Sequence, residues 1–151
     1  MNIAVLQTAR KGSLSVLNKN TMNIGGKPLF LHNIAHANKS RYSPNVYLST
    51  DIEDAKYHQK EYNFDIIKRP KRLCGSKSSH HDVLIHGIKE IERRESKVIE
   101  ILVLLLGNTM TAWTDDIDRA IDLIKDNVKI DSVISVGKYN MFNPIRAFSI
   151  N

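Results

Sequence analysis

The chain has 151 residues, enough for one domain with a sizeable core, and its 42% hydrophobic and 25% charged composition is typical of an ordinary globular protein. Its longest apolar stretch, residues 99–106, is interrupted by Glu100 and is too short to cross a bilayer, so we expect no membrane partner. A single cysteine, Cys74, excludes an internal disulfide, and the predicted location is the cytoplasm. The net charge of +6 permits an anionic partner, either nucleic acid or a polyanionic small molecule.

Apolar runs of strand length alternate with helical patterns along the chain. Strands are predicted over 3–6, 46–49, 64–67, 101–106 and 132–136, with a sixth over 146–150. Helices are predicted to begin at Pro28, at Asp51 (running to Tyr62), at Ser78 or Ser79, and at Thr114. This alternation predicts an α/β fold in one domain, residues 1–151, with a layered and mostly parallel sheet.

Two of these elements carry a further expectation. The run 101–106 is apolar at every position, which predicts a central strand that is covered on both faces. The last helix is acidic, and its carboxylates are predicted to form a solvated face, with the first of them favoured by the helix dipole: Asp115, Asp116, Asp118 and Asp122.

The positive charge is concentrated at the start of the chain. Residues 1–50 contain six Lys and Arg residues and no Asp or Glu, so the remainder of the chain is neutral on balance. The first predicted strand leads into a loop in which Gly12 and Ser13 can bring backbone amides close to oxyanions, while Arg10 and Lys19 supply positive charge. A cationic loop after a buried strand is where α/β proteins bind phosphates. The loop matches neither generic nucleotide motif, and a basic surface loop is an equal alternative on composition alone.

Read in order, these residues resemble the N-acylneuraminate cytidylyltransferases, which activate sialic acid and other nonulosonic acids. The family pattern P-A-R-x-G-S-K-G-x-x-x-K-N is matched in spacing by Ala9, Arg10, Gly12, Ser13, Lys19 and Asn20. The likeness continues through residues 26–29 (G-K-P-L), 49–51 (S-T-D), Arg69-Pro70 with Leu73 (R-P-x-x-L), Ser78-Ser79 with Asp82 (A-S-S-x-D) and 132–136 (S-V-x-S-V). It therefore extends over nearly the whole chain.

The resemblance implies a Rossmann-like, three-layer fold of the nucleotide-diphospho-sugar transferase type. It implies transfer of CMP from CTP to an acidic sugar with release of pyrophosphate, assisted by Mg²⁺, and a homodimer. Arg10 and Lys19 would be the catalytic residues that hold the triphosphate, and Arg69 and Arg146 would bind the sugar. The nucleotide would contact Ala9, Arg10, Gly12, Ser13, Lys19, Asn20, Ser79 and Asn108.

The chain also departs from the family. Leu106–Met110 replaces the family's Q-P-T-S-P and removes the glutamine that reads the base, and Leu14, Ser15 and Ser76 replace family residues. Asn108 stands where the wider fold has a metal-binding aspartate, and a neutral amide binds Mg²⁺ more weakly, so no metal ligand is identified in the chain. Relative to the family, we expect the chain to lack a C-terminal part that supplies metal-binding aspartates and the dimer extension.

Alternatives to these interpretations stay open. The chain could bind a nucleotide without turnover, or it could be a basic RNA-binding module. The RNA-binding alternative is disfavoured because the chain has no aromatic-rich stacking motif, so we expect no nucleic-acid partner. For Arg69 the other interpretation is a solvated basic loop, and for Arg146 it is an exposed side chain in a turn.

Overall fold

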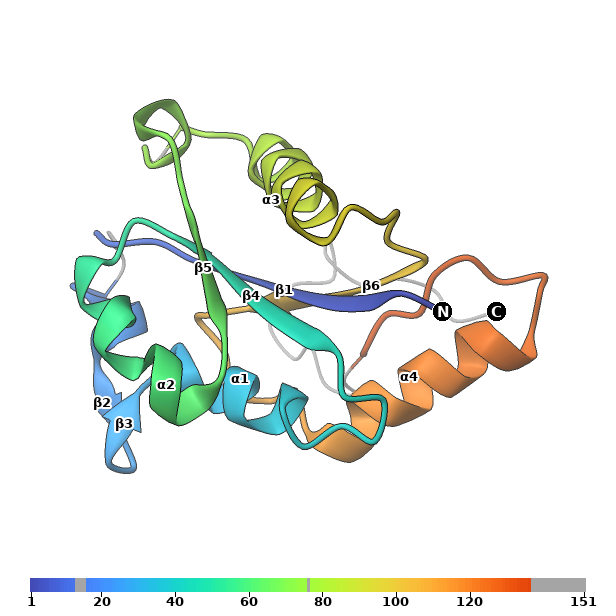
Figure 1. Cartoon of the computed structure of the whole chain (residues 1–151). Coiled ribbons are helices and arrows are strands. Elements are labelled where there is room, and N and C mark those ends of the chain that lie inside the picture. Colours follow the sequence, from blue (N-terminus) through green and yellow to red (C-terminus); the bar gives the residue numbers. More distant parts are fainter. Residues whose placement is uncertain (13–15, 76, 137–151) are drawn as a thin grey trace, which may run out of the picture.

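A computed structural model of the chain describes residues 1–12, 16–75 and 77–136. Within these residues the main sheet has four strands, all parallel, in the spatial order β5-β4-β1-β6 (Figure 1). The strands are β1 (Ile3–Ala9), β4 (Asn45–Thr50), β5 (Asp65–Lys68) and β6 (Ile101–Leu106). Ala9 pairs with Thr50 and Thr8 pairs with Leu106, so the carboxyl ends of these strands lie at one edge of the sheet.

Helices cover both faces of the sheet (Figure 1). Helix α3 (His80–Glu95) lies on one face, and α1 (Leu31–Ala37), α2 (Gln59–Tyr62) and α4 (Thr114–Asp126) lie on the other. Val5 of β1 packs into the cluster that contains α1 and α4, whereas Ala4 and Leu6 pack with Ile91 of α3. Alternate side chains of β1 thus pack against helices on opposite faces of the sheet, which confirms the predicted α/β fold. Within the described residues, no helix has both the length and the apolar composition needed to cross a membrane.

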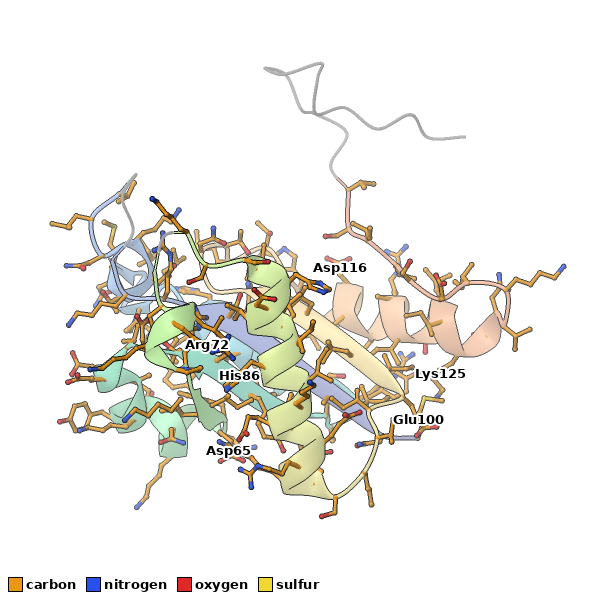
Figure 2. All side chains as sticks on the ribbon, turned by 90° about the horizontal axis from the view of Figure 1, so that it is seen from above. Asp65, Arg72, His86, Glu100, Asp116 and Lys125 are labelled. Carbon is orange, nitrogen blue, oxygen red and sulfur yellow. The ribbon has the colours of Figure 1, made fainter. Side chains whose placement is uncertain are left out.

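The inner strands of the described sheet are β4 and β1, and β6 is not one of them, which corrects the expectation for residues 101–106. Among the described residues, β6 pairs only with β1 and forms an edge of the sheet. Figure 2 shows α3 lying over the sheet with β6 to one side of it. Because α3 contacts β1 and β4, Leu104 and Leu106 on this face of β6 are each 42% exposed. An apolar run therefore indicated a strand but not its place in the sheet.

The helix predicted from Pro28 begins three residues later, at Leu31. Pro28 belongs instead to a short antiparallel hairpin of β2 (Asn23–Ile24) and β3 (Lys27–Pro28). Gly25 and Gly26 form its turn with φ of 57° and 90°, a pair of positive values that favours tight hairpins and that glycine adopts without strain. Proline at N1 of a helix and proline in an edge strand share the same φ, so Pro28 alone did not distinguish them.

Other predicted elements differ from the structure or lie outside it. The segment 51–62 is a 3₁₀ helix, η2 (Glu53–His58), followed by the short α2. Residues 132–136 form no strand, and Ile134 is largely exposed, because the apolar alternation finds no neighbouring strand to pair with among the described residues. The sixth predicted strand, 146–150, lies outside the described residues.

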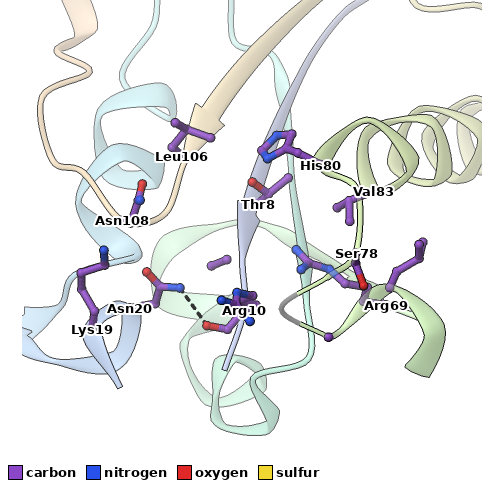
Figure 3. Close-up of a pocket in the computed structure, with 13 residues that line it drawn as sticks. Thr8, Arg10, Lys19, Asn20, Arg69, Ser78, His80, Val83, Leu106 and Asn108 are labelled. Atoms are coloured by element: carbon purple, nitrogen blue, oxygen red, sulfur yellow. Dashed lines mark hydrogen bonds between the residues drawn. The ribbon is translucent and has the colours of Figure 1, made fainter. Parts of the chain in front are cut away.

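The ends of β6 and β1 approach each other closely at Gly107. Its N–H donates to Thr8 O at 2.9 Å, and a Cβ at this position would lie 2.6 Å from the Cβ of Ala9. Only glycine fits this approach, which brings Asn108 and Thr8 to the same space (Figure 3). The turn after β6 therefore packs directly against the end of β1 at the carboxyl edge of the sheet.

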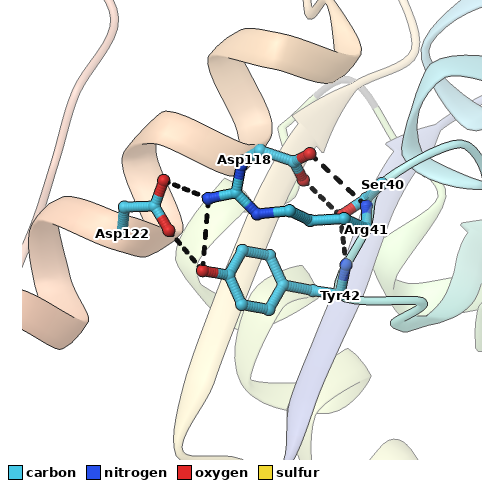
Figure 4. Close-up of polar contacts among 5 residues, drawn as sticks. All are labelled: Ser40, Arg41, Tyr42, Asp118 and Asp122. Atoms are coloured by element: carbon cyan, nitrogen blue, oxygen red, sulfur yellow. Dashed lines mark hydrogen bonds and ion pairs between the residues drawn. The ribbon is translucent and has the colours of Figure 1, made fainter.

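Helix α4 is attached to the turn after α1 by carboxylates that the sequence assigned to a solvated face (Figure 4). Asp118 is only 7% exposed, and it accepts hydrogen bonds from Ser40 Oγ at 2.5 Å and from Arg41 N at 3.4 Å. Asp122 accepts from the Arg41 guanidinium and the Tyr42 hydroxyl, and the bond from Arg41 holds the pKa of its carboxyl below the usual value. Asp118 is buried, so the predicted solvated face is wrong for it, whereas Asp122 stays partly exposed and pairs with Arg41 at the surface.

Candidate active site

A cavity of about 420 Å³, the strand-end pocket, lies at the carboxyl ends of β1 and β6. It is bounded by the end of β1, the turn η1 (Lys19–Thr21), the loop that follows β5, the first turns of α3 and the end of β6 (Figure 3). Ligands of open α/β sheets bind outside the carboxyl ends of the strands, where neighbouring connections diverge to opposite faces. Here the chain leaves β1 toward the hairpin and α1, whereas the connection from β5 leads to α3 on the other face.

The strand-end pocket brings together many of the residues singled out in the sequence. Its lining contains Ala9, Arg10, Lys19, Asn20, Arg69 and Asn108. Gly12 and Ser79 do not line it: Gly12 is an exposed turn residue with φ of 77°, and Ser79 is the exposed residue that precedes α3. Ser78 lines the pocket in place of Ser79. Ser13 and Arg146 lie outside the described residues.

Asn20 supports the backbone of the cationic loop and keeps one acceptor unused. It is 7% exposed, and its Nδ2 donates to Arg10 O at 2.8 Å (Figure 3). Its Oδ1 is buried and has no hydrogen-bond partner among the described residues. An unpaired buried acceptor lowers the stability of the fold by about 1–3 kcal/mol. A hydrogen-bond donor on a ligand could bind to this oxygen and remove that penalty.

Arg69 is a buried cation without a carboxylate partner among the described residues. It follows β5, is 7% exposed, and donates from Nη2 to Ser49 O at 2.8 Å, while its Nε has no partner there. Burial lowers the pKa of its guanidinium, and the charge of Asp51 opposes this shift without forming an ion pair. A desolvated charge of this kind is unfavourable unless it is paired, so the site attracts an anion.

The strand-end pocket is positively charged. Arg10, Lys19 and Arg69 are cationic, and no carboxylate belongs to its described lining. The carboxylate whose charge acts on Arg69 is that of Asp51, which lies outside the lining and whose Oδ1 accepts the Lys11 N–H at 2.7 Å. Cationic walls with no carboxylate select phosphate or carboxylate ligands.

The donors of the strand-end pocket do not fit a magnesium ion. In the part of the chain that the structure describes, no three His, Cys, Asp or Glu side chains gather into a metal site. Mg²⁺ is held by carboxylates together with water or phosphate oxygens, whereas this lining offers the amides of Asn20 and Asn108 beside cations. Within the described residues, the lining of the pocket therefore offers no carboxylate to the ion that the sequence resemblance implies.

Several lining residues were not singled out as site residues in the sequence. They are Thr8, Leu73, Gly75, Ser78, His80 and Val83, with Leu106, which was noted only as a departure from the family pattern. Thr8 and Ser78 adjoin predicted site residues, so their positions could have been found from the same motifs. His80 and Val83 reach the pocket because α3 begins there, and no motif in the sequence signals that placement.

Asn33 of α1 holds the segment that carries Leu106 and Asn108. Its Nδ2 donates to Leu106 O and to Thr109 O, both at 3.0 Å, and its Oδ1 accepts from Ala112 N at 3.3 Å. The side chain is 1% exposed, so these bonds are shielded from water. One buried amide thus fixes the wall of the strand-end pocket opposite α3.

Comparisons with known proteins point to one family. A family model described as cytidylyltransferase matches residues 4–145. No curated protein matches the chain significantly. A solved structure of CMP:2-keto-3-deoxy-manno-octonic acid synthetase complexed with CTP is similar with a TM-score of 0.64 and 18% identity, covering 85% of this chain and 49% of its own. A cytidylyltransferase from Leptospira borgpetersenii is similar with a TM-score of 0.63 and 21% identity, covering 84% of this chain and 50% of its own. The chain thus spans about half the length of these proteins, whose similarity shows the fold.

Proposed function

Because the chain belongs to the cytidylyltransferase family, we propose that it transfers CMP from CTP to an acidic, nonulosonic sugar and releases pyrophosphate. The observation that carries this proposal is the strand-end pocket, in which Arg10, Lys19 and Arg69 converge with no carboxylate in the described lining. A nucleoside triphosphate carries about four negative charges at neutral pH, since its terminal phosphate ionises with a second pKa of about 6. The charge of the site therefore matches that of the ligand. The synthetase of similar fold was solved with CTP.

In the proposed reaction, a hydroxyl oxygen of the sugar attacks the α-phosphorus of CTP. The bond from the α-phosphorus to the bridging oxygen breaks, the hydroxyl proton is released, and pyrophosphate leaves with the electron pair. Arg10 and Lys19 neutralise the negative charge that grows on the departing pyrophosphate, and cations that are in place before the reaction stabilise this charge without reorganisation. Catalysis of this kind depends on positioning and charge more than on a reactive side chain.

The other site residues are assigned to recognition. Asn20 Oδ1 is the free acceptor for a hydroxyl or amino group of the nucleotide. Arg69 pairs with the carboxylate of the sugar, which would satisfy its buried guanidinium. The resemblance further implies Mg²⁺ and a homodimer, and the proposal assigns the ion no ligand on this chain.

A pyrophosphate-release assay tests the proposal. The protein is incubated with CTP, MgCl₂ and a panel of nonulosonic acids, and we expect release that requires one of the sugars. Lys19→Gln is expected to reduce the rate strongly. Lys89→Gln removes the same charge from an exposed position of α3 outside the pocket and should leave the rate unchanged. Absence of both turnover and CTP binding would contradict the proposal.

A second candidate is a family member that binds CTP without turnover. It is favoured by the lining itself, because Leu106 is 42% exposed in the pocket and Asn108 offers a neutral amide where a carboxylate would hold a metal. Calorimetry separates the two functions. Binding of CTP together with no pyrophosphate release from any acidic sugar would support the second candidate.

A further inference from the structure

The strand-end pocket contains enough positive charge to bind a triphosphate without help from a metal. We infer that this chain binds CTP in its metal-free form, and that it binds this form at least as tightly as the magnesium complex. The inference rests on the proposed function, because it takes a nucleoside triphosphate as the ligand. It goes further by assigning to protein cations the charge neutralisation that Mg²⁺ provides in many nucleotide sites.

No Asp or Glu residue of the chain lines the strand-end pocket. All 16 Asp and Glu residues lie within the described segments, since residues 13–15, 76 and 137–151 contain none. None of the 16 belongs to the lining of the strand-end pocket. Burial lowers the pKa of Arg69 and the charge of Asp51 opposes this shift, but Asp51 accepts the Lys11 N–H and is not a lining residue. The lining of the pocket therefore offers no carboxylate to hold a divalent cation next to the phosphates.

The cations of the pocket remain unneutralised by the protein. Within the described residues, Arg10, Lys19 and Arg69 form no ion pair with a carboxylate. Arg69 is the most constrained of them, because its guanidinium is buried and Nε has no partner there. The 16-residue helix α3 also begins at the pocket with its positive dipole end, which adds about half a charge. An anionic ligand is thus the counter-charge that this arrangement lacks.

These charges set the direction of the magnesium effect. Binding of Mg²⁺ reduces the charge of CTP from about four negative units to about two, so it weakens the attraction to the pocket. The ion would also approach the cationic walls with no protein carboxylate to hold it, which adds repulsion. A pocket with carboxylate ligands shows the opposite dependence, because the metal then bridges protein and phosphates. The sign of the effect distinguishes the two kinds of site.

Titration calorimetry of the whole chain with CTP tests the inference, once with EDTA and once with excess MgCl₂ at matched ionic strength. We expect the Kd in EDTA to equal that in MgCl₂ or to be lower, by up to about tenfold. A Kd that is measurably higher in EDTA than in MgCl₂ would overturn the inference and leave the proposed function standing. Failure of CTP to bind in either buffer would reject the proposed function together with the inference.

Charge variants provide the second readout, the ratio of the Kd in MgCl₂ to the Kd in EDTA. Lys19→Gln and Arg69→Gln each remove one cation, so both should lower this ratio as well as weaken binding. Lys89→Gln, the matched control on α3, should leave the ratio unchanged. Circular dichroism verifies that each variant is folded, and Lys19→Gln keeps the test decisive should Arg69→Gln unfold. Equal ratios in the Lys19 and Lys89 variants would contradict the inference.

Discussion

Two buried side chains of the strand-end pocket, Arg69 and Asn20, have incomplete polar partners among the described residues, which lowers the stability of the free protein. Arg69 holds a desolvated positive charge with one described hydrogen bond, to Ser49 O, and Asn20 leaves Oδ1 unpaired. Each arrangement is unfavourable in the free protein by the usual rules for buried polar groups. At the scale of single residues, these unfavourable arrangements support the proposed binding role, because functional sites commonly exchange stability for binding.

Replacing Arg69 by methionine should separate these two contributions. The apolar side chain removes the desolvated charge, so we expect the free energy of unfolding to stay within about 1 kcal/mol of the wild type or to rise. CTP or acidic-sugar binding should weaken by about tenfold or more, because a charge-assisted contact is lost. Denaturant unfolding and calorimetry measure the two effects. A large loss of stability with unchanged binding would show that Arg69 is a structural residue.

The Asn20→Asp variant tests the second residue. The new carboxylate cannot donate to Arg10 O and places a negative charge in the proposed nucleotide site, so we expect CTP affinity to fall by about tenfold or more. Loss of the hydrogen bond should also destabilise the protein by about 1 kcal/mol. Calorimetry on the variant at neutral pH provides the measurement, and unchanged affinity would remove Asn20 from the binding site.

Elements far apart in the chain are joined by buried side-chain hydrogen bonds. Asn33 connects α1 to the segment after β6, and Asp118 connects α4 to the turn after α1. In both cases one polar side chain satisfies backbone or hydroxyl groups of a distant segment, and such bonds are strong because water is excluded. The segment after β6, which lines the pocket, is thus positioned by α1, a helix that does not line the pocket.

The Asn33→Asp variant should displace the segment that carries Asn108. A carboxylate cannot donate to the carbonyls of Leu106 and Thr109, so these acceptors lose their partner and the protein loses about 2 kcal/mol of stability. The comparison is Asn108→Ala, an exposed site that should change stability by less than about 0.5 kcal/mol while altering ligand binding. Thermal unfolding and CTP titration of both variants give the result. Equal stability losses would argue against this role of Asn33.

The Asp118→Ala variant should loosen α4. The side chain accepts from Ser40 Oγ and Arg41 N, and hydrogen bonds to charged groups contribute about 1.5–3 kcal/mol. We expect the free energy of unfolding to fall by about 2 kcal/mol, measured by urea denaturation. Asp116→Ala, on the same helix and exposed, should cost less than about 1 kcal/mol. Similar costs for the two variants would mean that the buried contact adds nothing.

Over the whole molecule, the net charge resides in one part of the chain, the first fifty residues, and part of this charge lies at the carboxyl ends of the strands. The acid-free first fifty residues form β1, the hairpin, α1 and β4, and two of their cations, Arg10 and Lys19, reach the strand-end pocket. The rest of the chain is neutral on balance and contributes Arg69. A field of one sign at a cleft raises the local concentration of an oppositely charged ligand.

Salt should therefore weaken binding in proportion to ligand charge. We expect the Kd for CTP to rise by about tenfold when the NaCl concentration is raised by about tenfold, since screening shortens the range of the attraction. CMP, with fewer phosphates, serves as the control and should respond less. Calorimetry across a salt series gives the two slopes, and equal slopes would contradict an electrostatic origin of binding.

Local patterns alone predicted most of the secondary structure. The apolar runs at 3–6, 46–49, 64–67 and 101–106 are strands, and helices begin at His80 and Thr114 as the capping signals indicated. The cationic loop after the first strand was also visible, because Arg10 and Lys19 stand in an acid-free stretch. These features depend on neighbours within a few residues, which the sequence displays directly.

Pairing between distant segments was decided only by the tertiary structure. The sequence did not show that β1 is an inner strand and β6 an edge strand of the described sheet, that Asp118 is buried against Ser40, or that His80 and Arg69 line one pocket. Strand order, the burial of a helix face and the closure of a pocket are set by the packing of residues far apart in the chain. The sequence by itself determined which segments are strands and helices and where the positive charge lies, whereas the packing determined which side chains share one cavity.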